Sequence, residues 1–132
     1  MTMIGDRYEV QKRLGAGGMA TVYLAWDTQL EREVALKALR PHLMAKPDEV
    51  ARFRDEARLL ARVDSDHVVP IYDSQFTGEL CYIVLRRLVG STLEQAVRTG
   101  RRNDATFALR VAADVLSGLI DLHRKNIVHR DI

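Results

Sequence analysis

The alternation of apolar and polar positions predicts short strands along the first two thirds of the chain. A period of two residues is typical of a strand with one buried face, and turn-forming residues at 27–32 and 77–79 separate neighbouring runs. Two strands joined by such a turn pair as an antiparallel hairpin. We therefore predict a five-stranded antiparallel sheet from residues 8–14, 21–26, 33–39, 68–73 and 80–88.

Apolar residues recur at helical spacing in the rest of the chain. Residues 48–63 follow Pro47, a residue that favours the first turn of a helix, and their apolar positions are spaced by three and four. Residues 104–125 carry a longer apolar stripe and end at Asn126, which tolerates the left-handed conformation after a helix. A short helix is expected at residues 91–97. Strands and helices together predict an α+β fold.

Composition narrows the class of protein. The chain has 132 residues, enough for one domain with a modest core, and its net charge of +2 gives no strong attraction to nucleic acid. Its single cysteine, Cys81, lies in an apolar run and indicates a buried thiol in a reducing compartment. No signal peptide and no apolar run of about 18 residues is found. We expect a cytoplasmic protein without a membrane segment and without a nucleic-acid partner.

A glycine-rich turn at residues 14–22 is the strongest chemical signal. Glycine lacks a Cβ, so the backbone N–H groups around Gly15, Gly17 and Gly18 can approach phosphate oxygens closely. Rossmann loops and P-loops lead into a helix, whereas residues 21–26 alternate as a strand. The sequence therefore predicts a hairpin that covers a phosphate-bearing ligand, rather than a loop at a helix N-terminus.

Lys37 lies on the third predicted strand. Alternation places Ala35 and Lys37 on one face, and Val22 joins them if the second and third strands pair. Glu56 lies on the apolar stripe of the predicted helix, where a buried carboxylate requires a cation. Two cations qualify, Lys37 on the sheet or Arg52 one helical turn away. The residues by themselves leave this choice open.

The order of these motifs resembles the first part of a eukaryotic-like protein kinase domain, and most closely that of the bacterial serine/threonine kinases. The resemblance covers residues 8–132. It implies a kinase N-lobe with ATP-binding function over residues 1–89, and the start of a C-lobe over residues 90–132. It rests on the glycine-rich turn, Val34-Ala35-Leu36-Lys37, Phe53-Arg54-Asp55-Glu56-Ala57, Tyr82-Ile83-Val84-Leu85 and His129-Arg130-Asp131.

The resemblance assigns a role to each matching residue. Asp131 would be the catalytic base, and Lys37, oriented by Glu56 in a buried pair, would hold the α- and β-phosphates of ATP. Leu85 would be the gatekeeper. The ATP-binding set implied by the family is Leu14, Gly15, Ala16, Gly17, Gly18, Met19, Ala20, Thr21, Val22, Ala35, Lys37, Glu56, Leu85, Arg86 and Leu88, the last two through their backbone.

The sequence also departs from the family pattern. Ala20 stands in place of the third glycine, and Arg86-Arg87 replaces an acidic-aromatic pair beside the adenine. The kinase residues that hold Mg²⁺ follow Asp131 in the family and are not found in this sequence, so we expect a truncated kinase that is inactive by itself. Partners implied are ATP, a protein substrate of the complete domain, and self-association or docking on another kinase. The alternative is a non-catalytic module for nucleotide binding or kinase docking.

Overall fold

The computed structural model describes residues 2–129, and the chain divides into two compact units. The first unit comprises Met1–Arg62 and Val69–Arg87, and the second comprises Val63–Val68 and Leu88–Ile132. The predicted lobe boundary after residue 89 stays a prediction. Among residues 2–129, no helix combines the length and the apolar character needed to cross a membrane.

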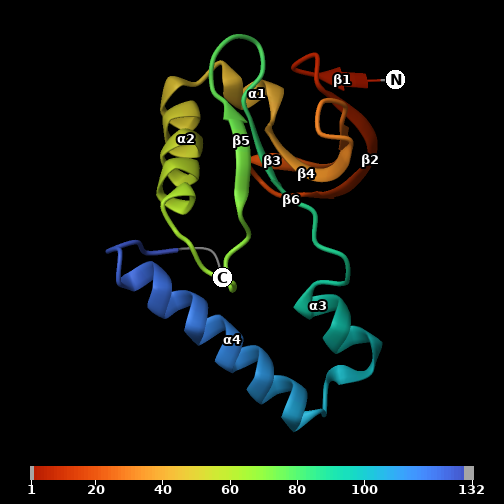
Figure 1. The fold of residues 1–132 in the computed structure, drawn as a ribbon, viewed down its shortest axis with the longest axis vertical. Coiled ribbons are helices and arrows are strands. Elements are labelled where there is room, and N and C mark those ends of the chain that lie inside the picture. Colours follow the sequence, from red (N-terminus) through yellow and green to blue (C-terminus); the bar gives the residue numbers. More distant parts are fainter. Residues whose placement is uncertain (1, 130–132) are drawn as a thin grey trace. The chain divides into compact units, whose positions relative to one another are not determined.

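The first unit is built on a six-stranded antiparallel sheet in the order β1-β2-β3-β4-β6-β5 (Figure 1). The α+β class is confirmed, but the number of strands was one too low, since β1 was not predicted. A three-residue strand gives too little alternation to detect. The strands are β1 (Thr2–Ile4), β2 (Tyr8–Ala16), β3 (Ala20–Asp27), β4 (Arg32–Leu39), β5 (Ile71–Gln75) and β6 (Tyr82–Arg86).

One face of the sheet buries an aromatic cluster, which we call the sheet core. Tyr8 and Tyr82 meet edge to face, with ring centroids 5.8 Å apart. Gly5 and Asp6 make the turn into this face with positive φ angles of 60° and 53°, as a tight hairpin of the primed type requires. The members of the sheet core are Ile4, Tyr8, Ala25, Val34, Leu36, Tyr82 and Val84.

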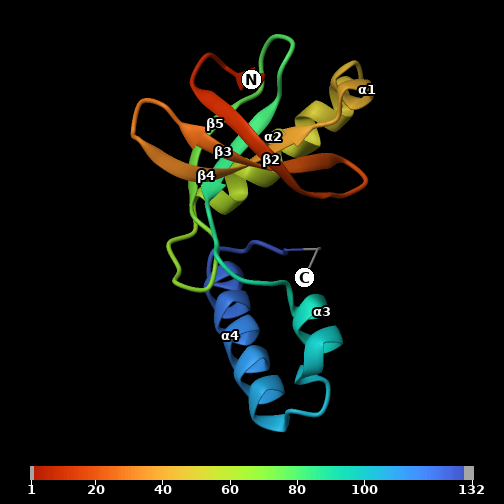
Figure 2. The same cartoon turned by 90° about the vertical axis from the view of Figure 1, so that its right-hand side faces the viewer.

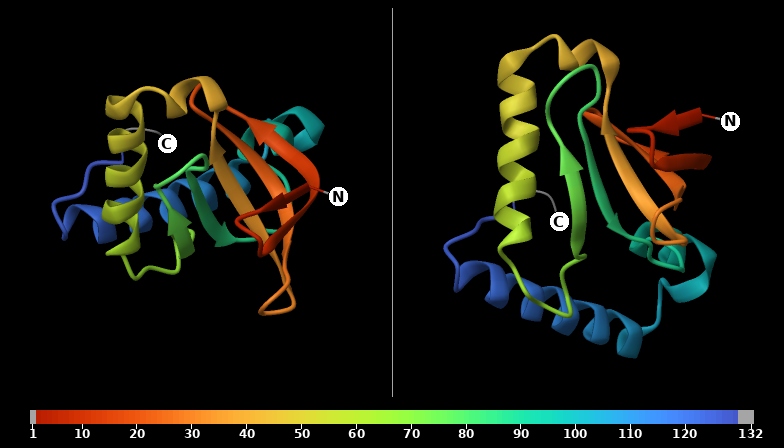
Figure 3. Two further views of the ribbon diagram at one scale, coloured as in Figure 1. Left: turned by 90° about the horizontal axis from the view of Figure 1, so that it is seen from above. Right: turned by 45° about the horizontal axis from the view of Figure 1, so that its top comes forward.

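The opposite face packs against helix α2 (Pro47–Ala61), which Figures 1 and 3 show beside β5. A short helix, α1 (Pro41–Met44), precedes α2 and was not predicted, because four residues carry no helical period. Phe53 and Phe76 meet edge to face in this layer, with centroids 6.1 Å apart. We call this layer the helix core; its buried members are Ala20, Leu39, Phe53, Ala57, Cys81 and Ile83.

A network of hydrogen bonds around Arg7, in the β1–β2 turn, links this turn to β3 and to β5. Arg7 donates two hydrogen bonds to the Asp27 carboxylate, at 2.8 and 2.7 Å, and pairs with Asp73 at 3.3 Å. The Tyr8 hydroxyl donates to the same Asp73 at 2.8 Å. Asp27 is fully buried and also accepts the backbone N–H groups of residues 29 and 30. The arginine network (Arg7, Tyr8, Asp27, Asp73) thus satisfies its buried charge completely.

The second unit holds the helices α3 (Leu93–Ala96) and α4 (Ala105–His123), which an irregular turn, η1 (Val97–Arg101), connects (Figure 2). Thr92 and Gln95 form a reciprocal capping box at the start of α3. Asp104 caps α4 by accepting the N–H of Phe107 at 2.9 Å. Asn126 follows α4 with a φ of 57°, as predicted from the sequence.

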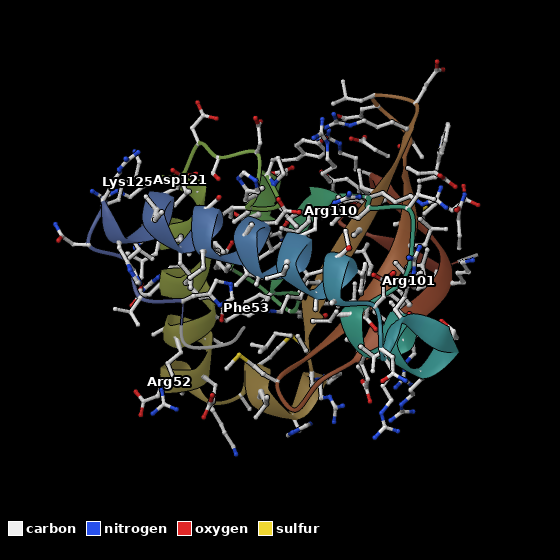
Figure 4. The ribbon with its side chains drawn as sticks, turned by 90° about the horizontal axis from the view of Figure 1, so that it is seen from below. Arg52, Phe53, Arg101, Arg110, Asp121 and Lys125 are labelled. Carbon is white, nitrogen blue, oxygen red and sulfur yellow. The ribbon has the colours of Figure 1, made fainter. Side chains whose placement is uncertain are left out.

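The loop of residues 63–68 packs against α4 within the same unit. The Ser65 hydroxyl donates to Asp121, which Figure 4 labels on α4, at 2.5 Å. His67 lies 3.5 Å from Asp114, and Gly118 is buried where a Cβ would press against the backbone and Cβ of His67. The absence of a side chain at Gly118 therefore allows the loop to approach the helix.

Candidate functional site

Lys37 and Glu56 are the two charged residues that the structure brings together on the helix-facing side of the sheet. The Lys37 ammonium donates to a Glu56 oxygen at 3.1 Å, and it lies 5.9 Å from the centre of the Phe53 ring. Strand β4 supplies the lysine and helix α2 supplies the carboxylate. The arrangement places a positively charged donor group on the helix-facing side of the sheet.

The choice between the two cations is settled, but the predicted burial of Glu56 is wrong. Its side chain is 46% exposed and that of Lys37 is 29% exposed. Phe53 and Ala57 take the buried positions on α2, and Glu56 lies beside them at the edge of the helix core. Arg52, on the outer surface of α2 in Figure 4, pairs with Glu49 at 3.7 Å instead. Helical spacing gave the direction of Glu56 correctly and its depth incorrectly.

The strand register assembles the rest of the predicted face. Val22 lies directly opposite Lys37, and Ala35 lies opposite Leu85 on the other side of β4. Directly opposed residues in an antiparallel pair point to the same face, so these four side chains share one surface. Val22, Ala35 and Leu85 are only partly buried, whereas Leu14 is exposed. A small residue between two larger apolar ones leaves room for a flat ring.

The glycine-rich turn joins β2 to β3 and is closed by a hydrogen bond from the Gly17 N–H to the Ala20 carbonyl at 2.9 Å. A Cβ added at Gly15 or Gly18 would have no atom within 4 Å, and at Gly17 only the Ala20 carbonyl at 3.9 Å. None of the three has a left-handed φ. The folded chain itself therefore has no steric need for glycine at these positions.

Two members of the turn pack their side chains against the protein. Ala20 is buried in the helix core, and Met19 packs against that core. That both residues also help to cover a ligand stays a prediction. Thr21 lies partly buried at the start of β3, opposite Ala38, and Ala16 is exposed at the end of β2.

The last residue of β6, Arg86, and the two residues that follow it have different surroundings. The Arg86 N–H donates to the Pro70 carbonyl at 3.1 Å, and its side chain is exposed. Arg87 pairs with Glu33 of the neighbouring strand. Leu88 belongs to the second unit and is exposed there. Asp131 lies outside the described residues, and among residues 2–129 no group of three or more His, Cys, Asp or Glu gathers as a metal site.

The pKa values of the other buried titratable groups are shifted by burial and by hydrogen bonds within the protein. Hydrogen bonding from Arg7 lowers the pKa of Asp27, and burial raises the pKa of the Cys81 thiol, as its apolar run predicted. Burial, and then the hydrogen bond to Asp73, raises the pKa of Tyr8. The arginine network was not predicted, because its members are up to 66 residues apart and no local pattern links them.

Comparison with known proteins agrees with this geometry. Residues 8–132 match the family model described as protein kinase domain. The chain is 42% identical to a probable serine/threonine-protein kinase of Streptomyces coelicolor, 38% to the serine/threonine-protein kinase PknB of Mycobacterium leprae and 36% to PrkC of Bacillus subtilis. In each comparison 98% of the chain is covered, but the chain spans only 20 to 21% of the relative's length.

Solved structures show the same fold. The kinase domain of Mycobacterium tuberculosis PknI, as a C20A mutant, superposes with a TM-score of 0.78 at 25% identity, over the whole chain and 56% of that structure. The apo form of PpkA-294 reaches a TM-score of 0.85 at 24% identity, over 98% of this chain and 53% of that one. The chain therefore belongs to the protein kinase domain family, with the bacterial serine/threonine kinases as its relatives.

Proposed function

We propose that the chain binds ATP on the helix-facing side of the sheet and forms the ATP-binding part of a serine/threonine protein kinase. The observation that carries the proposal is the lysine pair (Lys37 with Glu56), combined with glycines that the folded chain does not itself require. An ammonium group has three donors, and Glu56 accepts one of them. The others are directed to phosphate oxygens, which the family holds with this lysine.

The remaining side chains of this face fit the base of a nucleotide. Val22, Ala35 and Leu85 offer a partly buried apolar surface, and the exposed Leu14 covers it from the side of the turn. ATP supplies the phosphoryl group that a kinase transfers. Roles for Leu88 at the adenine edge and for Asp131 as catalytic base are carried over from the family and are part of the same proposal.

A binding titration with a Lys37→Met variant tests this proposal. We expect the variant to bind ATP on the order of 10- to 100-fold more weakly, because a charge-assisted hydrogen bond to phosphate is lost. The matched control is Lys125→Met, which removes an exposed lysine of the second unit (Figure 4). Calorimetry or a fluorescent ATP analogue gives the affinity. Equal affinities for the two variants would contradict the assignment of Lys37.

We further propose that these 132 residues, tested by themselves, bind ATP without transferring its phosphoryl group. Kinases neutralise charge on the phosphates with Mg²⁺ held by acidic and amide side chains, and residues 2–129 gather no group of three or more His, Cys, Asp or Glu. Incubation with labelled ATP, Mg²⁺ and a generic basic protein, with Lys37→Met as background, measures transfer. Labelling above that background would contradict the proposal.

Self-association of these residues by themselves is the second candidate property. Helix α4 exposes Leu109 (73%), Leu116 (59%) and Ile120 (51%), which are spaced as one helical face. An exposed apolar surface of this kind favours association. Size-exclusion chromatography with light scattering is expected to show oligomers that a Leu116→Gln variant dissociates. A monomer at every concentration would contradict it.

A further inference from the structure

Met19 is the only residue between Gly15 and Thr21 with a long apolar side chain. The other positions of this turn carry glycine or alanine. Its side chain is half-buried and packs against the helix core, on the side of the sheet that carries Lys37. The turn is therefore not held by its glycines. It is held by Ala20, which is buried in the helix core, and by Met19, whose longer side chain packs against that core.

A backbone hydrogen bond supports the same attachment. The Arg40 N–H donates to the Met19 carbonyl at 3.0 Å, and Arg40 directly precedes α1. Leu43 and Met44 of α1 pack against the helix core together with Met19. The turn and α1 thus share one hydrogen bond and one apolar layer.

The same layer contains the helix that carries the carboxylate of the site. Phe53 and Ala57 of α2 are buried in the helix core, and Glu56 lies between them along the helix. Any motion that lifts Met19 from this layer removes part of the packing of the cluster that includes Phe53 and Ala57. The turn, α1 and α2 therefore share one packed layer although they are separated in sequence.

We propose that Met19 is a positioning residue that couples the glycine-rich turn to α2, so that the turn and the Lys37–Glu56 pair move as one body. This inference rests on the proposed ATP site. Met19 acts through packing and backbone placement, not through contact with the nucleotide. A flexible thioether suits this role, because it can fill an irregular gap while the glycines on its N-terminal side adjust.

Two substitutions at Met19 and one matched control test the coupling in the natural polypeptide that carries these residues. Met19→Ala removes the packed side chain, and Met19→Leu restores apolar volume. Met3→Ala is the control, since Met3 lies on β1 with 42% exposure and outside the helix core. Hydrogen–deuterium exchange of residues 14–22 and 47–61, with and without ATP, reports motion of the turn and of α2. ATP affinity is measured on the same samples.

We expect Met19→Ala to speed exchange in the turn and to weaken ATP binding about 3- to 10-fold, as is typical of a residue that couples two elements. In the wild type, ATP slows exchange in both segments. In Met19→Ala the slowing in α2 is reduced. Met19→Leu recovers most of both effects, and Met3→Ala matches the wild type.

Three results would overturn the inference. Unchanged exchange in the turn of Met19→Ala would show that the side chain does not hold it. Faster exchange throughout the first unit, with no preference for the two segments, would indicate a general packing role. Failure of Met19→Leu to restore affinity would require a direct ligand contact. Absence of ATP binding in the wild type would instead overturn the proposed function. The coupling is then tested by hydrogen–deuterium exchange of α2 in Met19→Ala without ATP. Unchanged exchange in α2 would overturn the coupling.

Discussion

Two ion pairs of the first unit differ in burial and in the number of hydrogen bonds that their carboxylates accept. The Asp27 carboxylate of the arginine network is 1% exposed and accepts two hydrogen bonds from Arg7 and two from backbone N–H groups. The Glu56 carboxylate is 46% exposed and accepts one hydrogen bond from Lys37. The first pair is complete within the protein. The second leaves donors of a cation available at the surface of the sheet.

Two glycines of the first unit differ in the same way. Gly5, in the turn that precedes Arg7, has a φ of 60°, and a Cβ there would collide with the Tyr82 hydroxyl. Gly18, in the glycine-rich turn, has open space around it. One region is therefore determined by the needs of the folded chain. The other keeps residues that the fold does not require, which is the pattern expected where a ligand supplies the missing contacts.

The largest expected effect is a difference in the free energy of unfolding between variants of Asp27 and of Glu56. Asp27→Asn removes the buried carboxylate that accepts two hydrogen bonds from Arg7 and leaves the partly buried Arg7 with only the more exposed Asp73 as an ion-pair partner. We expect the free energy of unfolding to fall by about 3 kcal/mol. Glu56→Gln removes a largely exposed charge and is expected to cost at most about 1 kcal/mol. Urea unfolding followed by fluorescence of Trp26, the single tryptophan, measures the first unit.

Asp55→Asn provides the control for this comparison, because Asp55 is an exposed carboxylate on α2 whose nearest cation is 3.6 Å away. Its effect is expected to match that of Glu56→Gln. Similar losses for Asp27→Asn and Glu56→Gln would remove the distinction between a structural pair and a functional one.

The periodicity of the sequence predicted most strands and the long helices, but it did not predict contacts between residues far apart in the chain or the burial of individual side chains. Alternation and helical spacing located five of the six strands and both long helices, because their periods span many residues. The arginine network joins Arg7 to Asp73 across the fold, so no local pattern contains it. The partner of Glu56 followed from the family resemblance, and the residue's exposure required the packed structure. An apolar residue such as Met19 within a glycine-rich turn indicates packing against the protein, but its partners are distant in sequence and required the structure.

The next effect concerns the glycines. Gly5→Ala forces a residue with a Cβ into a left-handed conformation and against Tyr82, which donates a hydrogen bond to Gln75 at 3.1 Å. We expect a loss of about 1–3 kcal/mol. Gly18→Ala is expected to leave stability unchanged or to raise it by up to about 1 kcal/mol, since it only restricts the unfolded chain. Unfolding curves of the two variants measure both changes.

Gly18→Ala sharpens the comparison further when ATP binding is measured on the same protein. If the proposed ATP site is correct, a methyl group at Gly18 obstructs the approach of phosphate oxygens to the backbone, so affinity is expected to fall while stability does not. A variant that loses stability and affinity together would show that the fold does need this glycine. In that case the open space around it would no longer argue for a ligand.

The smallest expected effect is a difference in pH dependence. The hydrogen bonds from Arg7 lower the pKa of Asp27 in the folded state, so the unfolded chain binds more protons below the ordinary pKa of an aspartate, about 4. The stabilisation is present above that pH and is lost as the pH falls toward the lowered pKa. One such group contributes a slope of at most about 1.4 kcal/mol per pH unit in this range.

Unfolding free energies measured from pH 6 to pH 2.5 test this linkage. The wild type is expected to lose stability steeply below pH 4, and Asp27→Asn is expected to show a shallower acid limb. Asp104 has a lowered pKa through the backbone N–H of Phe107 and gives a slope of the same sign, so some dependence remains in the variant. Glu56→Gln is measured alongside as the matched comparison, since it removes a carboxylate that is 46% exposed. A shallower slope in Glu56→Gln than in Asp27→Asn would reverse the comparison and place the tighter pair at the proposed ATP site.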